Sequence, residues 1–404
     1  MFGTIWYIMI LPVIATIYLM VWHKKKTAWY ELVGMWAVCI ILIMIGQWAA
    51  VRVAVTDTEY WGHLGIKVEH NEPYSKWDTC DRQVRDGETC SGSGKDRTCS
   101  PKYRTEYYDC VKNTSRQCFL YDRMKNRHYI SYGRYRELAV RWGNDAKFRN
   151  MNRKGTIRRF IKRGRPYYTG EGNRYTAEWN KVWTTSEPMV SVHKYENRVA
   201  ASSSVLNFKQ VTEQKKIVYK LYDYPFMYEG GGGYEMVSIL SHTKKFPAAD
   251  TYWRFINGQF GPVKRIRVWI LLFEGQEREA ALYQKQHWKN GNKNELTLCI
   301  GMDRAGKVTW GEVFSWTEQD EMVIRVRNRI EAMEVVSDQS LIKLAMWAEK
   351  TAIPKYVKPE FTEKYKHLAV NPPIWIILVV WGVIALANIG LCIYIVRNSL
   401  DESH

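Results

Sequence analysis

The chain has 404 residues, of which 25% are charged, and its 59 lysine and arginine residues outnumber 41 acidic ones to give a formal net charge of +18. This much charge excludes a chain that lies wholly within lipid, and the positive balance favours anionic surroundings. The charge alone does not distinguish lipid headgroups, envelope polymers and nucleic acid.

Three apolar stretches flank one large polar region: Ile5–Trp22, Leu32–Val51 and Ile374–Val396. Each is close to the ~20 residues that a helix needs to cross a hydrocarbon core of ~30 Å. We therefore predict three transmembrane helices, with Gly46 in the second allowing a neighbouring helix to approach closely. A cleaved signal peptide is the alternative for the first stretch, but residues 1–4 are uncharged and no small-residue cleavage site follows.

The short loop between the first two stretches carries Lys24, Lys25 and Lys26. Short lysine-rich loops stay in the cytoplasm, so we predict that the N-terminus and the polar region lie outside it. Arg52, just beyond the second stretch, argues weakly for the opposite orientation. Residues 397–404 then form a cytoplasmic tail.

Five cysteines lie close together in the polar region: Cys80, Cys90, Cys99, Cys110 and Cys118. Disulfides persist in oxidising compartments, so this cluster fits an extracytoplasmic domain. Cys90 and Cys99 flank the turn at residues 91–94, so we expect these two to pair, but the sequence does not define the disulfide connectivity. A metal site is less favoured because no C-x-x-C pair occurs.

The remaining three cysteines lie in apolar surroundings. Cys39 and Cys392 belong to predicted spans and are expected to act as small apolar residues. Cys299 lies in the apolar run Leu296–Ile300, which predicts a buried strand residue. Because five is an odd number, one cysteine of the cluster stays free or reaches Cys299.

Residues 147–165 contain nine basic residues and no acidic one. The basic residues singled out for binding an anionic surface are Arg153, Lys154, Arg158, Arg159, Lys162, Arg163 and Arg165. Three interpretations stay open: a solvated basic face, an anionic lipid or envelope surface, and nucleic acid. Nucleic acid is the least favoured, because it requires the polar region to face the cytosol.

Residues 265–350 show the most regular pattern of the chain. The predicted strands are Arg265–Phe273, Leu296–Ile300 and Val308–Trp316, and the predicted helices are Glu274–Trp288, about Met322–Met333, and Asp338–Lys350. This order is typical of an α+β fold with one central sheet. The run Gly230–Gly233 lacks the spacing of a phosphate-binding loop and is expected to be a flexible loop.

The segment Phe273–Trp316 places a helix that ends in tryptophan before a Gly/Lys/Asn loop and an apolar strand. The residues in this order are Trp288, Gly291, Lys293, Asn294, Leu296, Leu298 and Ile300. The order resembles a TPM domain, found in membrane-anchored bacterial envelope proteins and in thylakoid-lumen repair proteins. The whole chain also resembles membrane proteins of unknown function from tailed phages and bacteria, through Asp57–Trp61, Cys90–Gly94 and Trp288–Asn294.

The resemblance implies an extracytoplasmic α/β sandwich on a multi-pass bacterial inner-membrane protein, with calcium binding or phosphatase activity in some members. The chain departs from the family where Glu295, in place of glycine, follows Asn294. Oxygen donors that would suit a calcium ion at the strand ends are Asn292, Asn294, Glu295 and Asp303. A solvated loop is the alternative explanation for these residues.

Together these patterns predict an α+β protein with three transmembrane helices. The predicted organisation is two spans with a lysine loop (1–54), a cysteine-containing β-rich and basic region (55–200), a TPM-like α/β domain (201–352), a linker (353–373), a third span (374–396) and a tail (397–404). The predicted function is to bind a protein partner or an anionic envelope surface, without catalysis or a cofactor. A calcium-dependent, phosphatase-like hydrolase is the alternative, and the oligomeric state is not defined.

Overall fold

The structure is a computed structural model that describes residues 7–22, 29–91, 98–143, 151–153, 158–162, 165–169, 173–203, 210–225 and 237–397. The glycine run at residues 230–233, predicted to be a flexible loop, lies outside the described residues. The lysine loop and the tail at 398–404 also lie outside them.

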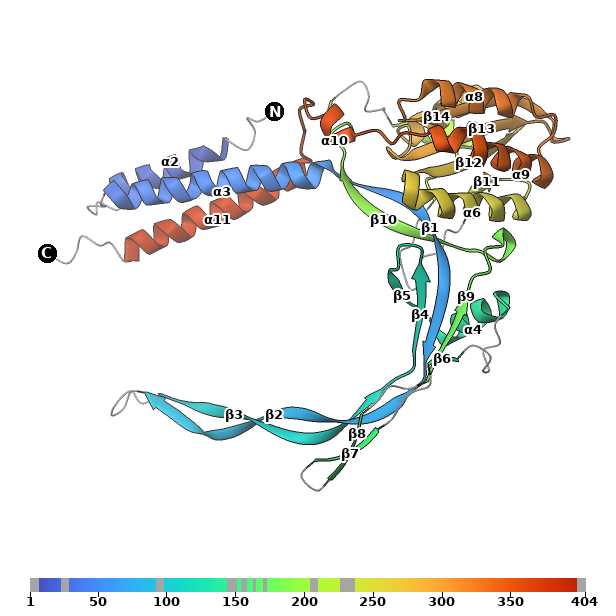
Figure 1. Ribbon diagram of the computed structural model, residues 1–404. Coiled ribbons are helices and arrows are strands. Elements are labelled where there is room, and N and C mark those ends of the chain that lie inside the picture. Colours follow the sequence, from blue (N-terminus) through green and yellow to red (C-terminus); the bar gives the residue numbers. More distant parts are fainter. Residues whose placement is uncertain are drawn as a thin grey trace.

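Among the residues that the structure describes, two helices are long and apolar enough to cross a membrane, α3 (Trp29–Val55) and α11 (Ile374–Arg397). The first apolar stretch is helical but shorter, through η1 (Tyr7–Met9), α2 (Ile10–Ile17) and η2 (Tyr18–Trp22). Figure 1 shows α2, α3 and α11 side by side, and buried apolar side chains from all three form a common core. Two of the three predicted spans are therefore present as membrane-length helices.

Helix α3 and helix α11 approach closely at Gly46, as predicted. A Cβ added to Gly46 would lie 2.5 Å from Cγ1 of Val380. The Sγ of Cys39 lies 3.1 Å from Oδ1 of Asn388, so one polar contact between the helices is buried among their apolar side chains.

Strand β1 (Thr56–Asn71) follows α3 without a break and forms the centre of a six-stranded sheet. The sheet has the order β5-β4-β1-β9-β6, and β10 pairs with the first half of β1. The remaining strands are β4 (Gln117–Asp122), β5 (Arg127–Tyr129), β6 (Met151–Arg153), β9 (Arg174–Glu178) and β10 (Glu187–Glu196). Helix α4 (Tyr132–Arg141) covers one face through a core that includes Val68, Leu120 and Leu138.

Strands β2 (Tyr74–Ser91) and β3 (Thr98–Thr114) form a long antiparallel hairpin that projects away from both sheets (Figure 1). Disulfides join Cys80 to Cys110 and Cys90 to Cys99, which confirms the one pairing predicted from the sequence. Cys118 is the odd cysteine of the cluster, and it is buried as a free thiol beneath α4. An isolated two-stranded ribbon is only marginally stable, so the two crosslinks explain how this hairpin persists.

A four-stranded sheet has the order β11-β12-β13-β14, in which β13 and β14 pair antiparallel and the other pairs are parallel. The strands are β11 (Ile239–Ser241), β12 (Arg267–Glu274), β13 (Glu295–Met302) and β14 (Val308–Ser315). Cys299 is fully buried in β13, as predicted.

Helices cover both faces of this sheet. Helices α6 (Pro247–Lys264), α8 (Asp320–Glu331) and α9 (Asp338–Trp347) pack on one face, and α7 (Glu279–His287) packs on the other. The smaller helices are α5 (Glu213–Val218), η4 (Trp183–Thr185), η5 (Ala348–Ala352), η6 (Ile353–Lys355) and α10 (Phe361–Lys364). The predicted strand–helix–strand–strand–helix order is confirmed, whereas β11 and α6 were not predicted.

Helix α6 also packs across β1 and so joins the two sheets. The contact depends on glycines: a Cβ added to Gly261 would lie 2.1 Å from the carbonyl oxygen of Gly62, and one added to Gly258 would lie 2.7 Å from the carbonyl oxygen of His63. Only glycine lets a helix backbone and a strand backbone come this close.

Candidate functional site

The loop between α7 and β13 has an unusual backbone. Lys289, Asn290 and Gly291 are all in the left-handed region, with φ of 52°, 66° and 74°. This conformation is unfavourable for a residue with a side chain. A Cβ at Gly291 would lie 2.6 Å from Oε2 of Glu295, so the glycine lets the loop fold back over the start of β13.

Glu295, the first residue of β13, is fully buried beneath this loop. Its Oε1 accepts hydrogen bonds from Nε1 of Trp269 at 3.1 Å and from the hydroxyl of Tyr224. Its Oε2 accepts from the main-chain N–H of Asn292 at 2.9 Å. Burial raises the pKa of the Glu295 carboxyl, although these hydrogen bonds and the charge of Arg267 act in the opposite direction.

Asn294 connects this loop to the strand that leaves the membrane helix. It is fully buried, and its Nδ2 donates to the carbonyl oxygen of Tyr60 in β1 at 2.6 Å. A buried amide that bonds a main-chain carbonyl holds the two segments in one geometry. Asn294 is therefore part of the junction between the two sheets.

Glu59 of β1 forms ion pairs with two lysines at the same junction. Its Oε1 lies 2.9 Å from Nζ of Lys358 and 3.6 Å from Nζ of Lys293. Burial lowers the pKa of Lys293, and the Glu59 charge acts in the opposite direction. Glu59 is only 3% exposed, so the pairing offsets the cost of burying its charge.

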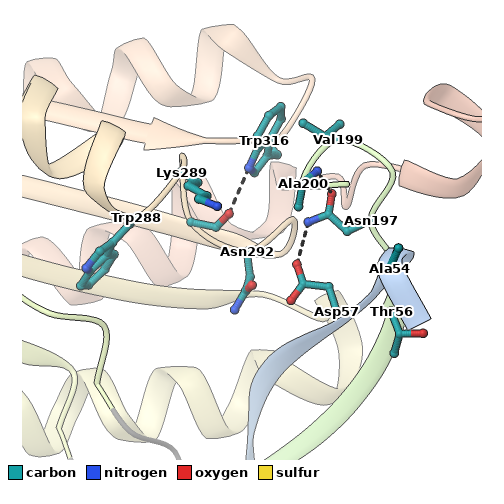
Figure 2. A pocket seen from close by; sticks show the side chains of 11 residues that line it. Ala54, Thr56, Asp57, Asn197, Val199, Ala200, Trp288, Lys289, Asn292 and Trp316 are labelled. Carbon is teal, nitrogen blue, oxygen red and sulfur yellow. Dashed lines mark hydrogen bonds between the residues drawn. The ribbon is translucent and has the colours of Figure 1, made fainter. Parts of the chain in front are cut away.

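A cavity of about 330 Å³ lies between this loop and the point where α3 becomes β1 (Figure 2). Asp57 accepts hydrogen bonds there from Nδ2 of Asn197 at 2.6 Å and from the hydroxyl of Tyr195 at 3.0 Å. Nε1 of Trp316 donates to the carbonyl oxygen of Gly291 at 3.1 Å. We call this cavity, together with the buried Glu295, Asn294 and Glu59, the junction site.

The structure brings together three of the four residues predicted as calcium ligands. Asn292, Asn294 and Glu295 lie at the start of β13, but Asp303 follows the opposite end of this eight-residue strand. At ~3.3 Å per residue, Asp303 is roughly 25 Å away. The four predicted ligands therefore do not converge on one point.

Another set of metal-type ligands, found on the β2–β3 hairpin, also lacks the chemistry of a metal site. Glu88, Cys90 and Cys99 place ligand atoms within 4.8 Å of one another among the described residues. Cys90 and Cys99 form a disulfide, so their sulfurs are not thiolate ligands.

The basic stretch predicted to bind an anionic surface forms short strands. Arg153 ends β6, and the hairpin of β7 (Arg158–Lys162) and β8 (Arg165–Thr169) contains Arg158, Arg159, Lys162 and Arg165. Lys154 and Arg163 lie outside the described residues. Anionic-surface binding by this stretch remains a prediction.

Several residues of the junction site were not predicted from the sequence, because they come from segments far apart in the chain. Glu59, Asn197, Tyr224 and Lys358 contribute to it from four separate segments. The acidic and aromatic run Asp57–Trp61 was noted in the sequence for the resemblance that it carries, without a role in any site.

Comparison with known proteins gives no relative for this chain: no family model matches it, and neither does any curated protein or solved structure.

Proposed function

We propose that the chain is an integral membrane protein that presents its polar part outside the cytoplasm to bind a protein partner or an anionic envelope surface. On this proposal α2 forms a third membrane crossing beside α3 and α11, and the protein binds its partner without catalysing a reaction. The family resemblance to TPM domains is consistent with this role.

One observation carries the proposal: the segment that follows β10 fastens the ends of both long apolar helices to the polar part. The N–H of Asn197 donates to the carbonyl oxygen of Val55, the last residue of α3, at 2.7 Å. The N–H of Asn371, just before α11, donates to the carbonyl oxygen of Ala201 at 2.7 Å. Two membrane-length helices that are fixed at one end of a polar body are expected of an anchored, surface-displayed domain.

The two disulfides supply independent support for the outer side of the membrane. Disulfides are rare in reducing compartments, and Cys80–Cys110 and Cys90–Cys99 both lie on the projecting hairpin. The excess of basic over acidic residues also suits an anionic partner.

The calcium-dependent hydrolase has less support from the geometry of the junction site. A hard cation needs several carboxylate or carbonyl oxygens that point at one position. Both oxygens of Glu295 already accept hydrogen bonds, and Asp303 lies at the far end of β13.

The test is thiol labelling with a membrane-impermeant maleimide on intact spheroplasts, with and without an external reductant. We expect labelling of the hairpin cysteines only after external reduction. A Cys90→Ser, Cys99→Ser variant is the matched control, because it should lose the labelling at these two positions and keep that of Cys80 and Cys110. Labelling that appears only after lysis, without reductant, would place the polar part in the cytoplasm and overturn the proposal.

A further inference from the structure

A second and larger cavity, of about 780 Å³, lies where α6 crosses the six-stranded sheet, apart from the junction site. Lys67 of β1 is in register with Tyr121 of β4 on one side and with Glu178 of β9 on the other. Paired residues on neighbouring strands project from the same face, so these three side chains form one wall. Phe255 and Gln259 of α6 line the cavity opposite them. The volume falls within the range of about 300–1,000 Å³ that is usual for small-molecule sites.

Aromatic rings contribute a fixed, flat part of this wall. Nε1 of Trp179 donates to the carbonyl oxygen of Val182 at 3.0 Å, which holds the indole in place. The ring of Phe255 lies with its centroid 6.3 Å from that of Trp179. Rigid aromatic surface with a few polar groups around it favours a ligand that carries a ring.

The rim of the cavity is strongly cationic. Arg123, Lys125 and Lys181 line it and are exposed, and within the described part of the chain no ion pair involves any of the three. Of the two acidic residues that line the cavity, Asp122 is buried and accepts hydrogen bonds from Asn126, so it serves the local turn. The remaining positive charge favours an anionic ligand.

Two of these three basic residues, both lysines, adopt a backbone conformation that glycine or asparagine would occupy at lower cost. Lys125 has φ of 66° and Lys181 has φ of 64°, each in a turn at the edge of the same cavity. Because Lys220, Arg265 and Lys289 share this conformation outside the cavity, the backbone alone assigns no role to the two rim lysines. It identifies them as positions where glycine can remove the charge without straining the fold.

We propose that this cavity, the rim site, binds an acidic saccharide. A sugar ring would lie against Trp179, its acidic groups would pair with Arg123, Lys125 and Lys181, and its hydroxyl groups would donate to Glu178. A carboxylate acceptor such as Glu178 suits a ligand rich in hydroxyl groups and repels a polyphosphate, which favours a saccharide over a nucleotide. This inference rests on the proposed extracytoplasmic function and names the chemistry of the anionic surface that would be recognised.

The test is isothermal titration of the full chain in nanodiscs of neutral lipid. The probes are an oligogalacturonate hexamer, the neutral maltohexaose, and ATP. We expect the acidic hexamer to bind, with an affinity that falls as sodium chloride is raised, and maltohexaose to bind at least about tenfold more weakly.

Lys125→Gly and Lys181→Gly are the informative variants, because glycine removes the charge and also relieves the strained backbone. Each should weaken binding of the hexamer by about tenfold while the melting temperature stays the same or rises. Lys220→Gly is the matched control, since Lys220 has φ of 47° but does not line the rim site. It should leave binding unchanged.

Four results would overturn the assignment: no binding of the acidic hexamer, equal affinity for maltohexaose, tighter binding of ATP, or unchanged affinity in both lysine variants. If thiol labelling places the hairpin outside and the hexamer does not bind, the rim site fails while the proposed function stands. If the hexamer binds but labelling places the hairpin in the cytoplasm, the proposed function fails and the ligand chemistry stands.

Discussion

Replacing Gly261 by alanine tests whether the close contact between α6 and β1 holds the two sheets together. The new Cβ would lie 2.1 Å from the carbonyl oxygen of Gly62 and 2.7 Å from its nitrogen. A carbon–oxygen contact needs ~3.3 Å, so one backbone must move by about 1 Å. Gly62 is also paired with Val190 of β10, and this pairing prevents β1 from moving away from α6.

The expected magnitude combines two opposing effects. Overpacking a tight contact lowers stability by about 1–3 kcal/mol. Replacing glycine by alanine inside a helix raises stability by roughly 1 kcal/mol, because alanine has the higher helix propensity. Because a contact of 2.1 Å with a backbone oxygen places the overpacking cost at the upper end of its range, we expect Gly261→Ala to lower the free energy of unfolding by about 2 kcal/mol, or the melting temperature by roughly 4–8 °C.

The assay is thermal unfolding of the full chain in nanodiscs, followed by tryptophan fluorescence. Gly133→Ala is the matched control, because this helical glycine has no heavy atom closer than 3.9 Å to the new Cβ. The control should melt at the same temperature as the native chain or slightly above it. A Gly261→Ala variant that is as stable as the control would refute the reasoning about this contact.

Three further predictions concern the junction site, the hairpin and acid stability. Asn294→Leu leaves a β1 carbonyl without its donor and should cost about 1–3 kcal/mol in chemical denaturation; an unchanged midpoint would contradict a role at the junction. Cys90→Ser with Cys99→Ser should cost the hairpin about 2–3 kcal/mol and speed its cleavage in limited proteolysis, whereas unchanged cleavage would show that the crosslink is dispensable. Desolvation lowers the pKa of His193 from 6.5 to about 4, so the unfolded chain binds the proton first and stability should fall between those two pH values as pH is lowered. His193→Phe should flatten this pH dependence in melting experiments, and an equally steep dependence would assign it to other groups.

The local pattern of apolar residues was sufficient to predict most of the strands and helices between residues 265 and 350. The predicted strand Val308–Trp316 is observed as Val308–Ser315, and the predicted helix at about Met322–Met333 is observed as Asp320–Glu331. These elements carry apolar residues at the period of their own secondary structure, so a short window of sequence contains the signal.

The elements that were missed lack such a signal. Strand β11 has only three residues, and α6 contains Pro262 together with two glycines that lower its intrinsic helix propensity. Tertiary packing stabilises both: α6 buries residues such as Trp253 and Ile256 against the sheet, and β11 is completed by pairing with β12. Secondary-structure propensity therefore fails to predict an element that is stabilised mainly by contacts with residues distant in the sequence.

The sequence by itself determined the apolar helices at the two ends of the chain and the α+β class. Both follow from residues that are near one another in the chain, because hydrophobic length and periodicity are local properties. Only the tertiary structure decided the junction site and the rim site. Asn294 bonds Tyr60 across 234 positions of sequence, and the rim site needs β1, β4, β9 and α6 at once, so neither exists until the strands have paired and the helix has crossed them.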